Sequence, residues 1–151
     1  MSSMQTPEPI RILMVDDDPA DVRLAREALK NNKLHVIMHD VPDGMEAMAF
    51  LRRQGPYAKM SRPDLILLDL NMPRMNGREV LAELKRDAEL GRIPVIVLTT
   101  SRGEEDILAA YDMNANCFIT KPVGWKKFIK VVESIELFWL TVVQLPKEQQ
   151  C

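Results

Sequence analysis

The sequence predicts an α/β domain built around a parallel sheet, and three observations lead to this fold class. Short apolar runs alternate with segments of helical periodicity from Ile10 onward, and five such pairs can be counted, as is typical of repeated βα units. Two of the runs end in aspartates, as expected where strand ends border a ligand-binding crevice. The 151 residues, with a formal net charge of −2, fit one domain with a substantial core.

The first βα unit places a strand at Ile10–Val15 and a helix at Pro19–Asn31. Three aspartates, Asp16, Asp17 and Asp18, lie between them. Aspartate is a favoured N-cap and proline a favoured first helical residue, so we assign Asp18 to starting the helix. Asp16 and Asp17 remain as candidates for a functional site.

The second unit comprises a strand at Leu34–His39 and a helix at Gly44–Gln54. Met45 and Met48 fall at helical spacing with other apolar residues, which favours packing in the core over metal binding. The connection Arg52–Pro63 carries four basic residues. We interpret it as a solvated loop rather than as a docking patch for an acidic partner.

The third strand, Asp64–Asp69, contains the unbroken apolar run Leu65–Leu68 and is therefore expected in the middle of the sheet, buried on both faces. It ends in Asp69, which would lie at the crevice where open α/β sheets bind ligands. A lone aspartate at this point would most often cap a turn. The two aspartates after the first strand, however, are expected at the same edge.

The last two strands add two polar residues to that edge. Pro94–Leu98 is followed by Thr99, whose hydroxyl can donate a hydrogen bond to a phosphoryl oxygen. Asn116–Thr120 is followed by Lys121, a point charge able to reach phosphate oxygens, although a surface lysine is usually only solvated. The third, fourth and fifth helices are expected at Asn76–Ala88, Gly103–Met113 and Gly124–Val143.

Three clustered carboxylates need positive charge. Asp16, Asp17 and Asp69 would repel one another unless a cation or protons relieve them. Oxygen ligands without a cysteine or histidine close by in the sequence suit a hard ion such as Mg²⁺, which also accepts phosphate oxygens. Together with Lys121, this ion would balance the negative charge of the three carboxylates. The sequence therefore predicts a phosphoryl site that uses Mg²⁺.

Four segments on successive strand ends resemble the receiver domain of two-component response regulators. They are Val15-Asp16-Asp17, Asp69–Gly77, Leu98-Thr99 and Thr120-Lys121-Pro122, within a match that covers about Ile10–Ile135. The resemblance implies a flavodoxin-like, doubly wound (βα)5 receiver fold. Its five-stranded parallel sheet has the order 2-1-3-4-5, and here it carries an extended C-terminal helix.

The same resemblance implies the role of each site residue. Asp69 accepts a phosphoryl group from the phosphohistidine of a histidine kinase, and Thr99 and Lys121 hold the phosphoryl oxygens. The implied metal ligands are Asp17 and Asp69 directly, the backbone carbonyl of Asn71, and Asp16 largely through water. The protein would be a signalling protein that catalyses only its own phosphorylation and dephosphorylation.

The resemblance also implies a conformational switch, in which Thr99 moves toward the phosphoryl group and Phe118 turns inward. Many relatives carry tyrosine at the position of Phe118, so the readout here would depend on ring packing. The corresponding peptide bond is cis in the family, so the resemblance predicts a cis bond between Lys121 and Pro122. The switch would change the face formed by the fourth helix, fifth strand and fifth helix, and apolar residues there predict a homodimer: Phe118, Leu137, Trp139 and Leu140.

Three short segments narrow the resemblance further: Val22–Leu24, Asn116–Phe118 and Phe138–Leu140. They are similar to the single-domain regulators of cyanobacterial and bacterial phytochromes, which implies a phytochrome-type histidine kinase as the phosphoryl donor. Two alternatives stay open. One is a haloacid-dehalogenase-like phosphatase with Asp16 as nucleophile, because Asp16–Asp18 contains an Asp-x-Asp motif, and the other is an inert receiver-like binding scaffold.

The composition of the chain also indicates its domain organisation and its cellular location. We expect a flexible N-terminal arm at residues 1–9, the receiver domain at 10–143 and a C-terminal tail at 144–151. No apolar window reaches membrane-span length, the start lacks a signal peptide, and Cys117 and Cys151 are interpreted as free thiols, which together indicate a cytoplasmic protein. The near-neutral charge and the lack of a basic helix indicate no nucleic-acid partner.

Overall fold

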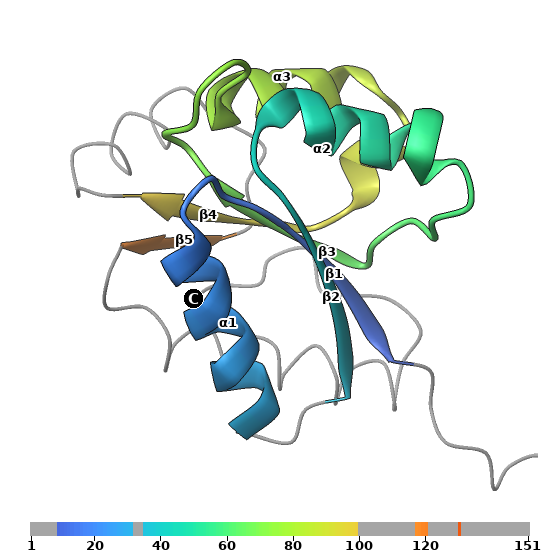
Figure 1. The fold of residues 1–151 in the computed structure, drawn as a ribbon. Helices are drawn as coiled ribbons and strands as arrows, with labels where there is room; N and C mark the ends of the chain where they lie inside the picture. Colours follow the sequence, from blue (N-terminus) through green and yellow to red (C-terminus); the bar gives the residue numbers. More distant parts are fainter. Residues whose placement is uncertain (1–8, 32–34, 100–116, 121–129, 131–151) are drawn as a thin grey trace, which may run out of the picture.

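The computed structural model describes residues 9–31, 35–99, 117–120 and 130, and its strands form one parallel sheet (Figure 1). The strands are β1 (Ile10–Val15), β2 (Val36–Val41), β3 (Leu65–Asp69), β4 (Val95–Thr99) and β5 (Cys117–Thr120). They lie in the order β2-β1-β3-β4-β5, and every neighbouring pair is parallel. This is the strand order implied by the family resemblance.

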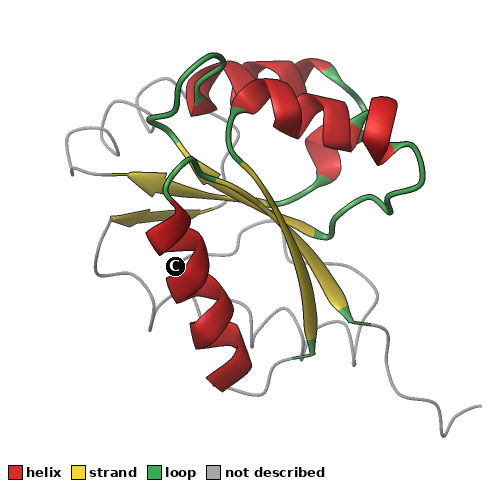
Figure 2. Cartoon of the chain, viewed as in Figure 1, coloured by secondary structure: helices red, strands yellow, loops and turns green. Residues whose placement is uncertain are grey.

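Helices cover both faces of the sheet (Figure 2). The helix α1 (Pro19–Asn31) lies on one face, and α2 (Gly44–Leu51) and α3 (Gly77–Arg86) lie on the other. Two short 3₁₀ helices, η2 (Gly55–Tyr57) and η3 (Leu90–Arg92), follow α2 and α3. The described part is therefore doubly wound, as predicted.

The central strand β3 contributes to a hydrophobic core on each face, because successive side chains of a strand point to opposite sides. All five of its residues are buried. Leu67 belongs to the core beneath α1, together with Ile12 and Ala25. Leu68 belongs to the core beneath α2 and α3.

Several element boundaries differ from the sequence-based prediction. β2 runs from Val36 to Val41 rather than from Leu34 to His39, because it pairs along its whole length with β1. α2 ends at Leu51, short of Gln54, and Arg53 then adopts a left-handed conformation with φ of 55° that cannot continue a helix. Met45 was expected in the core but is 53 % exposed, whereas Met48 is buried as expected.

The predicted helices Gly103–Met113 and Gly124–Val143 lie outside the described residues, apart from Lys130, which is helical and exposed. The predicted terminal arm and tail also lie outside them, except for Pro9. Among the helices of the described ranges, none combines the length and the apolar character that crossing a membrane requires.

Candidate functional site

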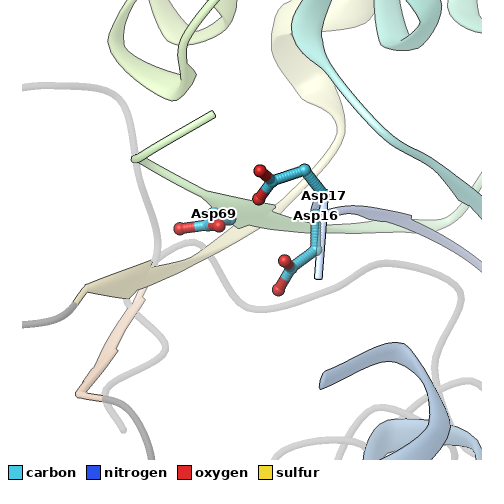
Figure 3. Close-up of side chains that lie close together, drawn as sticks. All are labelled: Asp16, Asp17 and Asp69. Atoms are coloured by element: carbon cyan, nitrogen blue, oxygen red, sulfur yellow. The ribbon is translucent and has the colours of Figure 1, made fainter. Parts of the chain in front are cut away.

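Three carboxylates that are far apart in the sequence meet at one edge of the sheet (Figure 3). Asp16 and Asp17 follow β1, and Asp69 is the last residue of β3. β1 and β3 are neighbours with Val15 opposite Leu68, so both strands end at the same level. Ligand oxygens of the three aspartates all lie within 4.8 Å of one another.

The three aspartates differ in exposure. Asp16 and Asp69 are each 3 % exposed, whereas Asp17 is exposed to solvent. Buried carboxylates in such proximity raise each other's free energy when ionised, so the cluster favours a bound cation. Three carboxylate donors, without sulfur or imidazole in the cluster, fit a hard, oxygen-preferring divalent ion.

Backbone N–H groups fix the two buried carboxylates. The N–H of Asp18 donates to Oδ1 of Asp16 at 2.9 Å, and the N–H of Asn71 donates to Oδ1 of Asp69 at 3.1 Å. Both bonds reach a donor two residues further along the chain, as in Asx turns. Asp18 itself accepts a hydrogen bond from the N–H of Ala20 at 2.9 Å, which confirms it as the N-cap of α1.

The segment Leu70–Asn76, here called the β3–α3 loop, connects Asp69 to α3. It is closed at its base by a hydrogen bond from the N–H of Gly77 to the carbonyl of Leu70 at 3.1 Å. Asn76 forms a reciprocal capping box with Glu79, which fixes the start of α3. The loop therefore holds Asn71, a predicted ligand through its carbonyl, directly beside Asp69.

A fourth aspartate near this edge was not singled out from the sequence. Asp43 is 4 % exposed and caps α2 by accepting the N–H of Glu46 at 2.9 Å. Its second carboxylate oxygen lies 3.3 Å from Nε of Arg74 in the β3–α3 loop. Aspartate followed three residues later by glutamate is a helix-start signal, so the cap was visible in the sequence, but the contact with Arg74 was not.

The remaining predicted residues are placed only in part. The backbone of Thr99 ends β4 opposite Thr120 of β5, and Asp69 lies opposite Leu98, so all three strands end at the same edge. The side chains of Thr99 and Phe118 lie outside what the structure describes. The same holds for Lys121 and its bond to Pro122 and for the predicted dimer residues Leu137, Trp139 and Leu140.

This fold and this edge define a class of protein: a doubly wound parallel α/β domain with an acidic pocket, suited to a hard cation, at the ends of its central strands. Residues 12–133 match the family described as the response regulator receiver domain. The chain belongs to this family and is thus a response regulator, a signalling protein of two-component systems.

Relatives of known structure support this membership at high similarity. Response regulator Rcp1 of Synechocystis sp. is 49 % identical over 146 residues, which are 97 % of this chain and 99 % of Rcp1. The phosphorylated cyanobacterial phytochrome response regulator RcpA is 52 % identical with a TM-score of 0.75, over 91 % of this chain and 99 % of RcpA. The Mn²⁺-bound form of Rcp1 is 50 % identical with a TM-score of 0.74, over the same shares of the two chains.

The comparisons give no support to the phosphatase alternative. The segment Asp69–Gly77, which that alternative leaves unexplained, lies within the matched range.

Proposed function

We propose that Asp69 accepts a phosphoryl group from the phosphohistidine of a histidine kinase and that Mg²⁺ is held beside it. The observation that carries this proposal is the meeting of Asp16, Asp17 and Asp69 at the carboxyl edge of the sheet. The Mn²⁺-bound structure of the relative Rcp1 supports a divalent ion in this family. The residues that would hold the ion here are Asp16, Asp17, Asp69 and the backbone carbonyl of Asn71.

In the proposed step a carboxylate oxygen of Asp69 forms a bond to phosphorus while the phosphorus–nitrogen bond of the phosphohistidine breaks. The imidazole nitrogen keeps the electron pair, and Asp69 becomes an acyl phosphate. Asn71 orients the carboxylate through its backbone N–H. Bound Mg²⁺ supplies positive charge that offsets the charge on the phosphoryl oxygens.

Thr99 and Lys121 complete the proposed site by holding phosphoryl oxygens. The ends of β4 and β5 lie at the same edge as Asp69, which supports a role for the residues at and just after these ends. A positively charged amine would also lower the energy of the extra negative charge that phosphorylation brings.

The phosphoryl donor is proposed to be a phytochrome-type histidine kinase. The support is the similarity to RcpA and Rcp1, because the aligned region covers 99 % of each of these two proteins. A phosphotransfer profile against a panel of histidine kinases tests this point. Rapid transfer from an unrelated kinase, with none from a phytochrome kinase, would refute the proposed donor while leaving Asp69 as the acceptor.

Signal output is proposed to occur through the face of the fourth helix, β5 and the fifth helix, with Thr99 and Phe118 as the switch. A homodimer through Phe118, Leu137, Trp139 and Leu140 remains part of this proposal, as does a receiver unit at 10–143 in a cytoplasmic protein. Light scattering with and without phosphorylation tests the dimer. A monomer at high concentration in both states would exclude it.

The central experiment measures Mg²⁺-dependent phosphorylation by a small acyl phosphate, followed by mass spectrometry of the intact chain. Asp69→Asn is expected to abolish the added phosphoryl mass, because the nucleophilic oxygen is lost. Asp18→Asn is the matched control: it removes an aspartate next to the pocket but keeps a good N-cap, so phosphorylation should persist. Full phosphorylation of Asp69→Asn would refute the proposal.

A further inference from the structure

The β3–α3 loop is tied to the start of α2 by two contacts. The N–H of Gly44 donates to the carbonyl of Met75 at 2.9 Å. Nε of Arg74 lies 3.3 Å from Oδ2 of Asp43. Two connections that both emerge at the carboxyl edge of the sheet are thereby joined, and one of them carries Asn71.

The ion pair is asymmetric in its burial. The Asp43 side chain is 6 % exposed, whereas that of Arg74 is 58 % exposed. One oxygen of Asp43 is used by the helix cap and the other faces Arg74. A nearby cation stabilises a buried carboxylate, so Asp43 attracts Arg74, and the loop with it, toward α2. The exposure of Arg74 keeps this attraction modest.

Backbone geometry indicates that this position is held against a local preference. Arg74 has a φ of 67°, in the left-handed region that residues other than glycine rarely adopt. The loop also approaches α2 too closely for a side chain at Gly44, where a Cβ atom would lie 2.3 Å from the carbonyl oxygen of Met75. The contact with Asp43 is an interaction that opposes relaxation of Arg74 to an ordinary conformation.

Movement of Arg74 would be passed on to the phosphorylation pocket. The loop is closed between Leu70 and Gly77, and the backbones of Gly77 and Asp69 approach each other so closely that a Cβ at Gly77 would lie 2.5 Å from the carbonyl oxygen of Asp69. With the two ends of the loop joined in this way, we infer that a shift at Arg74 changes the backbone of the few residues between them, which include Asn71. The N–H of Asn71 donates a hydrogen bond to Oδ1 of Asp69 and so helps to orient this carboxylate.

We propose that Asp43 and Arg74 are positioning residues for the phosphorylation pocket, and that their ion pair holds the β3–α3 loop in the geometry that binds the divalent ion. The inference rests on the proposed function. It makes Arg74 a residue that favours cation binding although it is itself a cation.

The test measures the Mn²⁺ affinity of the full chain by titration calorimetry. Arg74→Gln removes a positive charge close to an acidic pocket, so electrostatics alone would tighten Mn²⁺ binding. A positioning role predicts the opposite sign, about tenfold weaker binding, as is typical when a residue that orients a metal ligand is lost. Asp43→Asn keeps the helix cap, removes the ion pair and should weaken binding by a similar factor.

The double variant D43N/R74Q tests whether Asp43 and Arg74 affect Mn²⁺ binding through their mutual contact or independently. If the two residues act as one unit, the double variant binds Mn²⁺ about tenfold more weakly than the parent, rather than about a hundredfold. The matched control is the exposed pair Arg26–Asp40, which lies between α1 and β2. Arg26→Gln and Asp40→Asn make the same changes of charge and should alter the affinity by less than about twofold.

Arg74→Gly is the control for misfolding, because glycine readily adopts the left-handed φ of this position but supplies no cation. It should fold and also bind Mn²⁺ more weakly. Unchanged or tighter binding by Arg74→Gln or Arg74→Gly overturns the inference, as does a double variant whose loss is the product of the single losses. A parent protein that binds no Mn²⁺ would overturn the proposed function together with this inference, whereas normal parent binding with unaffected variants overturns the inference alone.

Discussion

At the residue scale, the pocket brings together two buried carboxylates and one exposed carboxylate. Asp16 and Asp69 are almost fully buried, and one oxygen from each lies within 4.8 Å of one oxygen of Asp17. Ionised carboxylates in this arrangement destabilise the native state unless positive charge is close. The stability of the protein should therefore depend on divalent ions.

If Mg²⁺ occupies the native pocket as proposed, and does not bind the unfolded chain, it should raise the free energy of unfolding. At 100 times the dissociation constant the gain is about 2.7 kcal/mol. Urea denaturation in Mg²⁺ and then in a chelator measures the difference. In Asp17→Asn the gain at the same Mg²⁺ concentration should be smaller, and an equal gain in this variant would argue against Asp17 as a ligand.

Single residues also show how far sequence reasoning reaches. Asp16, Asp17 and Asp69 could be singled out because each stands at the end of an apolar run, a local signal. The pairing of Asp43 with Arg74 could not, because it joins two loops and depends on a left-handed φ at an arginine. No residue type or spacing in the sequence predicts the left-handed conformation of Arg74.

At the scale of elements, local signals located some boundaries and tertiary contacts set others. α1 begins at Pro19 as predicted, because Asp18 and Pro19 are a strong helix start. β2 was placed two residues too early, because its polar Asp40 obscured a strand whose extent is set by pairing with β1. α2 was extended too far, since nothing before Gly55 in the sequence marks a helix end.

The start of α3 offers a test of one such local signal. Asn76 caps the helix and completes the capping box with Glu79. Asn76→Ala should lower the free energy of unfolding by about 1 kcal/mol, and Asn76→Ser should cost much less because serine caps nearly as well. Thermal denaturation of the two variants measures this, and equal losses would show that the cap itself contributes little.

The 3₁₀ helix η2 is anchored to α2 through a hydrogen bond from the Tyr57 hydroxyl to the carboxylate of Glu46. This bond, followed by burial and by the charges of Glu46 and Asp43, raises the pKa of Tyr57 to about 12 from the usual 10.0. The native state therefore holds this proton more tightly than the unfolded chain does. The resulting stability is fully present below pH 10 and is lost as the pH rises through 12.

Tyr57→Phe should remove this pH dependence. Below pH 10 the variant is expected to be about 1 kcal/mol less stable than the parent, because it lacks a hydrogen bond to a charged group. The gap should narrow as the pH approaches 12. Urea midpoints for both proteins across this range measure the gap, and a constant gap would contradict the assigned cause.

At the scale of the whole molecule, one strand joins two hydrophobic cores. Parallel sheets of this kind are covered on both faces, which the unbroken run Leu65–Leu68 predicts from the sequence. The strand order could not be predicted in this way, because periodicity identifies strands but not their neighbours. Only the family resemblance implied that β1 lies between β2 and β3. Order depends on long-range pairing, which no local pattern encodes.

We expect Leu67→Ala and Leu68→Ala each to lower the free energy of unfolding by about 3 kcal/mol, because each leaves a cavity in a fully buried core. Their side chains lie in different cores, so both sides of the sheet should prove equally sensitive. Leu24→Ala, at a residue that is 47 % exposed, is the control and should change the stability by less than about 0.5 kcal/mol. Chemical denaturation tests all three.

The exposure of Asp17, set against the burial of its two companions, also bears on kinetics. The exposed carboxylate of Asp17 is directly accessible to a hydrated ion arriving from solution. Exchange with the surroundings would then be governed by the shedding of water from the ion, which is slow for Mg²⁺. Occupancy of the proposed site would therefore follow the free Mg²⁺ of its compartment, so that readiness to receive a signal is set by the medium as well as by the kinase.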